Sequence, residues 1–304
     1  MLHASAPSSL FVFGLGYSAR RLARALSAEG WTVSGTYRRD SSRTALADEG
    51  LGVHLFDRNH PLDADGRAAL AASQNVLVSI PPDAQSDPTF DCHGADLAAR
   101  RDLRWLGYLS TTGVYGDRAG GWVDEDSQLL PVGERGKRRV AAERGWLDMW
   151  RQHGLPAHVF RLAGIYGPSR SALDAVRRGE ARRVVKPGQV FSRIHVADIV
   201  SVLRASLARP RPGAIYNVCD DDPSPPQDVI RYACELLGVA LPPETPFESI
   251  AGAMSEMGRS FYAESKRVAN RRIKEELGVR LAFPSYRDGL RALSEESAEP
   301  PSRG

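Results

Sequence analysis

The chain has 304 residues, of which 42% are hydrophobic and 25% are charged, and its formal net charge at pH 7 is +3. This composition is that of an ordinary globular protein, and the length favours two unequal lobes over a single core. The small and dispersed positive charge argues against nucleic acid as a partner. Cys92, Cys219 and Cys234 lack metal-ligand spacing, so we expect reduced thiols and no metal site. The N-terminal segment resembles neither a signal peptide nor a membrane span, and we therefore expect a cytoplasmic protein without a membrane partner.

Strands and helices alternate along the first half of the chain. Short apolar runs predict the strands, and apolar residues at helical spacing predict the helices between them. The predicted strands cover residues 9–14, 31–38, 52–56, 75–80 and 105–111, and the predicted helices cover residues 17–30, 42–50 and 95–104. This alternation is typical of a Rossmann-type, doubly wound parallel sheet with helices on both faces, which is the fold class that we expect.

The second half follows the same pattern more loosely. Its predicted strands cover residues 157–167 and 214–220, and its predicted helices cover residues 196–208, 225–238 and the basic segment 266–278. Residues 241–258 are rich in loop-forming types. We expect an NADP-binding Rossmann domain over residues 1–165. Sheet strands and a helix at about residues 190–221 would also belong to this domain. Residues 166–304 would form mainly a smaller, substrate-binding lobe.

A glycine-rich turn joins the first predicted strand to the first predicted helix. Gly14 permits the tight turn, Gly16 lets the backbone approach a pyrophosphate, and Ala19 is small enough for the helix to pack against the strand. The amides of Tyr17 and Ser18 would face the phosphates at the positive end of the helix dipole. The alternative is a plain tight turn, but the surrounding strand and helix pattern favours a dinucleotide site.

The end of the second predicted strand distinguishes between the two nicotinamide cofactors. An acidic residue there would bind a ribose 2′-hydroxyl, but this strand is followed by Arg38 and Arg39 before the first acid, Asp40. A guanidinium suits a 2′-phosphate, which a carboxylate would repel. The sequence therefore favours NADP over NAD, with a solvated arginine pair as the alternative. We also assign Ser79, which lies in the fourth predicted strand, to the cofactor site.

Several motifs resemble those of the extended short-chain dehydrogenases/reductases, the NAD-dependent epimerase/dehydratase family. They are LSTTGVYGD at 109–117, FRLAGIYGPSR at 160–170, SRIHVADIV at 192–200, GAIYNVCDD at 213–221 and ESKRVANRRIKEELG at 264–278. They occur in the family's order, and the similarity is greatest to its atypical YeeZ-like branch. The resemblance implies a dinucleotide cofactor and a small-molecule substrate. It also implies that Asp57 is the carboxylate that contacts adenine, a loop carboxylate being the alternative.

The resemblance further implies where the reaction takes place. In the family a Ser or Thr, a Tyr and a Lys run the hydride chemistry, and Thr111 corresponds to the hydroxyl that binds the substrate oxygen. The Tyr-x-x-x-Lys pair falls on the helix after Pro131, where this chain has Arg135 and Arg139. A guanidinium keeps its proton, so Arg135 cannot be the general acid/base, although it could polarise a carbonyl or clamp an anion. Arg139 could take the role of the Lys, and a solvated helix face is the alternative for the whole charge run.

The substrate-binding residues that we expect are Tyr166, Arg193 and Tyr262, on segments that the resemblance places at the substrate cleft. Nucleotide-sugar epimerases often have an Arg four residues before the His of I-H-V, where this chain has Phe191. This argues against a sugar nucleotide. Tyr115, Tyr166 and Tyr262 are the phenols that would replace the missing one, although each is more often a packed aromatic residue.

Two functions stay open. One is an NADP-dependent oxidoreductase or epimerase-like enzyme with a non-standard active site that acts on a small, anionic substrate. The other is a non-catalytic NADP-sensing or scaffold protein. Thr111 and the complete substrate lobe favour the enzyme, whereas the missing Tyr and Lys favour the sensor. The state of assembly also stays open, a homodimer being one option.

Overall fold

The structure, a computed structural model, describes residues 8–298 apart from the side chains of residues 256, 257, 260, 297 and 298. The chain divides into two compact units. The sheet unit comprises Met1–Thr111, Glu134–Arg161 and Val200–Tyr216, and the C-terminal unit comprises Thr112–Gly133, Leu162–Ile199 and Asn217–Gly304. Residues 1–7, which carry part of the argument for a cytoplasmic protein, lie outside the described residues. The assignment of cofactor and substrate binding to separate domains stays a prediction.

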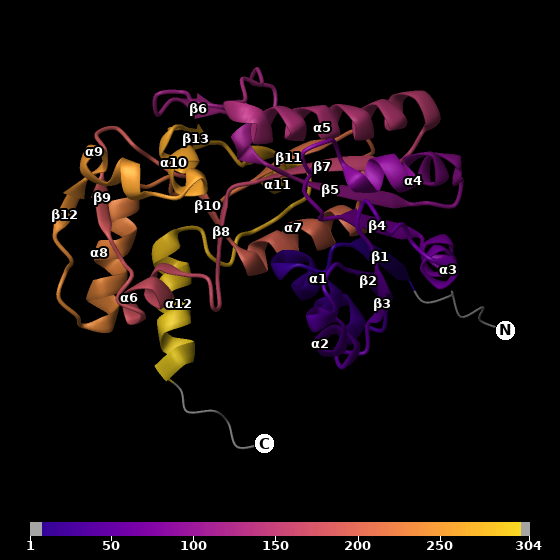
Figure 1. Cartoon of the computed structure of the whole chain (residues 1–304), viewed down its shortest axis with the longest axis horizontal. Helices are drawn as coiled ribbons and strands as arrows, with labels where there is room; N and C mark the ends of the chain where they lie inside the picture. The colour runs from indigo at the N-terminus through magenta and orange to yellow at the C-terminus, as the bar shows by residue number, and fades with distance from the viewer. Residues whose placement is uncertain (1–7, 299–304) are drawn as a thin grey trace. The chain divides into compact units, whose positions relative to one another are not determined.

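A parallel sheet of seven strands forms the centre of the sheet unit (Figure 1). Its strands are β1 (Ser9–Phe13), β2 (Thr32–Tyr37), β3 (Gly52–Leu55), β4 (Asn75–Val78), β5 (Trp105–Thr111), β7 (Ala157–Leu162) and β11 (Ile215–Val218). They lie in the order β11-β7-β5-β4-β1-β2-β3. The strand order therefore reverses between β1 and β4, and in sheets of this kind ligands bind outside the carboxyl ends of the strands at that reversal. The expected Rossmann-type fold is confirmed.

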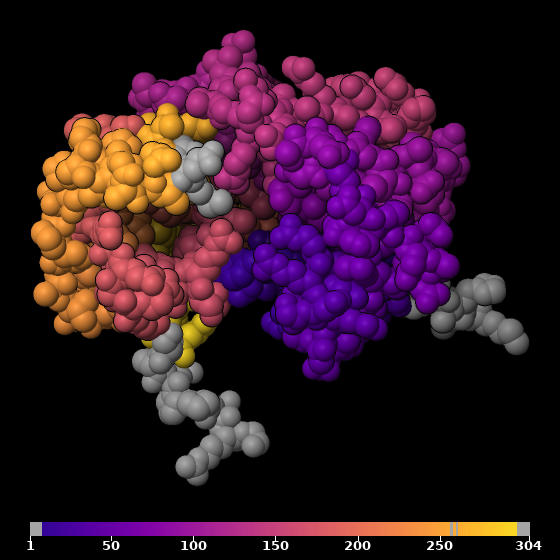
Figure 2. All heavy atoms as spheres, viewed as in Figure 1, coloured from indigo at the N-terminus to yellow at the C-terminus, as the bar shows by residue number. Residues whose placement is uncertain are grey.

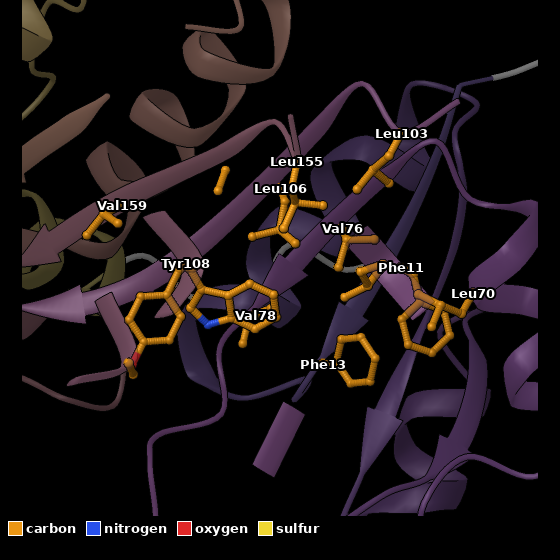
Figure 3. Close-up of a cluster of buried hydrophobic side chains, with 14 of the residues drawn as sticks. Phe11, Phe13, Leu70, Val76, Val78, Leu103, Leu106, Tyr108, Leu155 and Val159 are labelled. Carbon is orange, nitrogen blue, oxygen red and sulfur yellow. The ribbon is translucent and has the colours of Figure 1, made fainter. Parts of the chain in front are cut away.

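The strands of the sheet centre are mainly apolar because both of their faces are covered. All residues of β1 and β4 are buried. Figure 3 shows part of this core, in which Phe11 and Phe13 of β1 lie near Val76 and Val78 of β4. The rings of Phe11 and Phe13 meet edge to face, 5.0 Å apart. This packing fixes the two strands between which the sheet order reverses.

Helices connect the strands of the sheet. They are α1 (Tyr17–Ala28), α2 (Arg43–Ala47), α3 (Ala64–Ala72), α4 (Pro88–Ala99), α5 (Gly133–His153) and α7 (Val196–Ala208), with the short turns η1 (Asp40–Ser42) and η2 (Thr112–Tyr115). The helix expected at residues 95–104 is wrong in its bounds. It begins earlier because Asp87 caps it by accepting hydrogen bonds from the amides of Thr89 and Phe90, and because Pro88 suits the first turn. No helix within residues 8–298 is long and apolar enough to cross a membrane.

The C-terminal unit contains small paired strands and helices. The strand pairs are β6 (Trp122–Val123) with β13 (Arg267–Val268), β8 (Gly164–Tyr166) with β10 (Arg193–His195), and β9 (Arg183–Val185) with β12 (Glu244–Pro246). The helices are α6 (Ala172–Arg177), α8 (Pro226–Leu237), α9 (Phe247–Ile250), η3 (Ala251–Ala253), α10 (Glu256–Tyr262), α11 (Arg271–Glu275) and α12 (Tyr286–Ala298). The single basic helix expected at residues 266–278 is wrong. Its first residues form β13, and the helix begins only at Arg271.

Candidate functional site

The turn after β1 has two glycines with different surroundings. Gly14 has a φ of +92°, and a Cβ atom there would lie 2.7 Å from Cγ1 of Ile80. Its amide donates to Oγ1 of Thr36, 2.8 Å away. Gly16 has an ordinary φ of −83°, and no atom of the described residues lies within 4 Å of a Cβ placed on it. Gly14 is therefore required by the turn itself, whereas Gly16 leaves open space beside the backbone.

The open space at Gly16 lies at the N-terminus of α1. Gly16 is the N-cap residue of this helix, and within the described part of the chain no side chain caps it. The first turn contains no acidic residue. Ser18 and Ala19 are buried in that turn. An uncapped helix N-terminus is positive and presents amide donors, which suits a phosphate.

The other predicted cofactor residues follow the carboxyl ends of neighbouring strands. Arg38 and Arg39 come directly after β2, and both are exposed. Neither guanidinium has a hydrogen-bond or ion-pair partner among residues 8–298. Ser79 comes directly after β4, and its amide donates to the carbonyl oxygen of Phe13 at 2.9 Å. Because β2, β1 and β4 are parallel neighbours, these residues lie along one edge of the sheet.

Asp57 follows β3 and holds its own loop together. Its Oδ1 accepts from the amides of Asn59 and His60 at 2.8 and 3.0 Å, and it lies 2.9 Å from Nδ1 of His60. Burial alone would raise the pKa of this carboxyl, but the hydrogen bonds from His60 and Asn59 prevail and lower it. The contact with adenine stays a prediction.

Arg135 and Arg139 lie in different environments on α5. Nη1 of Arg139 donates to the carbonyl oxygen of Leu109 at 2.7 Å and to the hydroxyl of Tyr108 at 3.1 Å. The half-buried Arg139 is thus fixed at the end of β5, the strand that ends in Thr111. Arg135 is exposed and has no partner in the part of the chain that the structure describes. The structure therefore brings Arg139, and not Arg135, to the strand that carries Thr111.

A buried polar network lies below the end of β5, and the sequence reasoning missed it. Glu143 of α5 pairs with Arg161 of β7 at 2.8 Å, and each is 2% exposed. Ser110 donates its hydroxyl to the same carboxylate. Charged groups so deeply buried are stable only when they are paired and hydrogen bonded. An arginine inside the apolar strand sequence HVFRL was the signal that could have revealed the network.

A second missed cluster lies beside the loop that follows β4. Arg58 pairs with Asp83 and Asp91, in each case at 2.6 Å. The hydrogen bonds from Arg58 lower the pKa of Asp83 to about 2. Arg138 of α5 donates to the carbonyl oxygen of Asp83 at 3.0 Å. These contacts fix the loop next to Ser79.

The three predicted substrate-binding residues line one cavity of the C-terminal unit. Tyr166, Arg193 and Tyr262 share this cavity, which has a volume of about 500 Å³, with residues of α8 and α12. Figure 2 shows the surface of this unit hollowed between the salmon-coloured segment near α6 and the orange segment near α10. Their role in binding a substrate stays a prediction.

Comparisons with known proteins show similarity to one family model and to two proteins over most of their length. Residues 92–219 match the model of the NAD dependent epimerase/dehydratase family. Over 287 residues the chain is 28% identical to Protein YeeZ of Escherichia coli (strain K12), covering 90% of this chain and 95% of that protein. Over 290 residues it is 27% identical to a 3-diazoavenalumate denitrifying reductase of a Streptomyces species, covering 88% of this chain and 94% of that protein.

One solved structure is similar to this chain along nearly the whole length of both chains. It is described as a functionally unknown conserved protein from Silicibacter pomeroyi DSS. It is 50% identical with a TM-score of 0.86, and the match covers 96% of this chain and 100% of that chain.

Proposed function

The chain belongs to the NAD-dependent epimerase/dehydratase family, as a relative of the YeeZ proteins, and on this basis we propose that it is an NADP-dependent oxidoreductase or epimerase-like enzyme acting on a small, anionic substrate. The observation that carries the proposal is the arrangement at the carboxyl edge of the sheet. There the open turn at Gly16 and the uncapped N-terminus of α1 lie beside the strand followed by Arg38 and Arg39. The turn would hold the pyrophosphate, and the arginines would hold the 2′-phosphate.

The chemistry would depend on a fixed cation instead of a phenol–lysine pair. NADP supplies or accepts a hydride when it is bound. Thr111 would donate a hydrogen bond to the substrate oxygen. Arg139, fixed to the carbonyl of Leu109, would stabilise negative charge developing on that oxygen at every relevant pH.

The proton would come from a group other than the missing tyrosine. Tyr115 donates its hydroxyl to Oδ1 of Asn217 at 2.7 Å, and Tyr166 donates to the carbonyl of Ser285 at 3.3 Å. Tyr262 is half-buried on the cavity, and its hydroxyl has no hydrogen-bond partner among the described residues. Of the three candidate phenols, Tyr262 is therefore the one whose hydroxyl stays available to a ligand.

A non-catalytic NADP sensor is the second candidate. The observation that favours it is the exposure of Arg135, which stands where the family has its proton donor. No neighbour within residues 8–298 holds this side chain toward Thr111. A sensor would bind NADPH through the same turn and arginines but would leave it unchanged.

Turnover of NADPH distinguishes the enzyme from the sensor. We expect loss of NADPH absorbance when the protein is mixed with a small-molecule cell extract or with carboxylated and phosphorylated carbonyl compounds. Thr111→Val should reduce that rate at least about tenfold, because it removes a donor to the reacting oxygen. Thr112→Val, which removes the neighbouring hydroxyl, should change it little. Tight NADPH binding without consumption in any mixture would favour the sensor.

A further inference from the structure

The cavity of the C-terminal unit has the size and the walls of a small-molecule site. Helices α6, α8 and α12 pack on one another around a core that includes Leu173, Val229 and Leu290 (Figure 1). The cavity volume of about 500 Å³ lies within the range of about 300–1,000 Å³ that is usual for ligand pockets. Val229, Leu290 and Tyr286 give it an apolar side.

The charged residues of the cavity have one sign. Arg170, Arg178, Arg182 and Arg193 all line it, and among the described residues no aspartate or glutamate does. Arg178 is paired with Glu180 at 2.7 Å, outside the lining. Arg182 and Arg193 form no ion pair within residues 8–298. A cavity with unbalanced guanidinium groups attracts anions.

Hydrogen bonds from one nitrogen of the guanidinium hold Arg193 in one orientation. Its Nη1 donates to the carbonyl oxygens of Phe191 and Ser224 at 2.9 and 3.0 Å. The guanidinium lies 5.9 Å from the centre of the ring of Phe191 and 5.9 Å from that of Tyr286. Neither Nε nor Nη2 donates to any residue in the described part of the chain. These two groups form the edge of the guanidinium that binds carboxylates and phosphates through two parallel hydrogen bonds.

Asp220, the acid with the largest electrostatic effect on Arg193, does not neutralise it at neutral pH. The amide of Asp220 donates to the carbonyl of Arg193 at 2.7 Å, and the Asp220 side chain is only 1% exposed. Its Oδ2 has no hydrogen-bond partner among the described residues. Burial raises the pKa of Asp220 to about 8, although the positive charge of Arg193 opposes this. The carboxyl is therefore mainly protonated at pH 7, and the charge of Arg193 stays available to a ligand.

We propose that this cavity binds the carboxylate or phosphate group of a small ligand through the Nε–Nη2 edge of Arg193, with the apolar part of the ligand on Tyr286, Val229 and Leu290. The inference rests on the proposed function and names the chemical class of its substrate. The inference places the anion at Arg193. Nucleotide-sugar epimerases often have their arginine two residues earlier, and this chain has Phe191 there. Arg182 at the exposed rim would attract the anion, but Arg193 would bind it.

Titration with inorganic phosphate and with malonate tests the site. All proteins would carry Arg38→Gln and Arg39→Gln, so that these two arginines do not bind the probes. In this background we expect both probes to bind, and Arg193→Gln to weaken both at least about tenfold, because a bidentate charge-assisted pair is lost. Arg193→Lys, which keeps the charge but loses the fork, should weaken binding less and should keep the fold. Arg209→Gln removes the charge of an exposed arginine of the sheet unit and should have no effect.

The comparison of phosphate with malonate separates the two sources of the anion. Tighter binding of phosphate indicates a phosphorylated substrate, and tighter binding of malonate indicates a carboxylated one. The proposal would be overturned if the background protein with Arg193 intact bound neither probe. It would also be overturned if Arg193→Gln bound both probes with the same affinity as that background protein. NADPH affinity is measured separately in the wild-type protein and in Arg193→Gln. A protein that binds malonate but not NADPH would contradict the proposed function and leave this inference intact.

Discussion

Arg135 and Arg139 are four residues apart on one helix, yet of the two only Arg139 has partners among the described residues. The sequence indicated correctly that a helix carries both arginines, and the inability of either to act as a proton donor stays a prediction. It could not indicate that Arg139 binds the carbonyl of Leu109 or that Arg135 is exposed. Those contacts depend on how α5 lies against β5, and helical periodicity does not specify this. The anion preference that the sequence assigned to both arginines finds a second basis at Arg193, in the C-terminal unit.

Asp220 makes anion binding in the cavity depend on pH. As the pH rises through about 8, this carboxyl ionises and neutralises Arg193. Asp222 opposes the ionisation and is itself paired with Arg287 at 2.8 Å. Burial raises the pKa of the tyrosines Tyr166 and Tyr262, so they do not interfere. Malonate affinity should therefore fall on the order of fivefold between pH 7 and pH 9 in the wild type and stay level in Asp220→Asn.

The same carboxyl has a consequence for stability. Its pKa in the folded protein lies above the unfolded value, so its protonation stabilises the fold at low pH. That contribution is lost as the pH rises toward about 8. Urea unfolding should show that Asp220→Asn gains stability relative to the wild type between about pH 4 and pH 9. If the difference in the free energy of unfolding between the two proteins stays constant across that range, Asp220 is already ionised at neutral pH.

At the scale of elements, local signals predicted the strands of the large sheet and the helices α7 and α8 well, but they predicted the bounds of α4 and the segment after Lys266 poorly. The apolar runs of β1, β4 and β5 were identified because buried parallel strands are apolar on both faces. The start of α4 was missed although Asp87-Pro88 is a clear helix start. The basic segment after Lys266 reads as one helix, but the amide of Arg267 donates to the carbonyl of Gly121, and the amide of Ala269 donates to that of Val123. This pairing with residues far away in the chain overrides helical propensity.

The strand–turn–helix element β1-turn-α1 yields a matched pair of variants. Gly16→Val should abolish NADPH binding and leave the protein folded, because the added side chain enters space that the protein itself does not fill. Gly14→Ala should instead destabilise the fold by about 1–2 kcal/mol or more, because of its positive φ and the contact with Ile80. Calorimetric titration and urea unfolding measure the two effects. If Gly16→Val binds NADPH with unchanged affinity, the turn has no role beyond the fold.

At the scale of the whole molecule, the sequence predicted the sheet and one edge of it as the cofactor site. Parallel strands end at the same edge, and the structure makes β4, β1 and β2 neighbours, so Gly16, Arg38 and Ser79 lie along that edge. The cavity of the C-terminal unit was not predictable in the same way. Tyr166, Arg193 and Tyr262 were assigned to a substrate site by resemblance, whereas its arginine-rich lining depends on the packing of α6, α8 and α12. Sequence spacing carries no information on such long-range packing.

Cofactor preference tests the central claim most directly, because the proposed enzyme and the proposed substrate class both presuppose an NADP-binding protein. Calorimetric titration would compare NADPH with NADH, in the wild type and in a chain carrying Arg38→Gln and Arg39→Gln. We expect NADPH to bind the wild type at least about tenfold tighter, since a bidentate arginine–phosphate contact contributes about 1.5–3 kcal/mol. The double variant should lose this preference and keep its affinity for NADH. Equal affinities of the wild type for the two nucleotides would contradict the account.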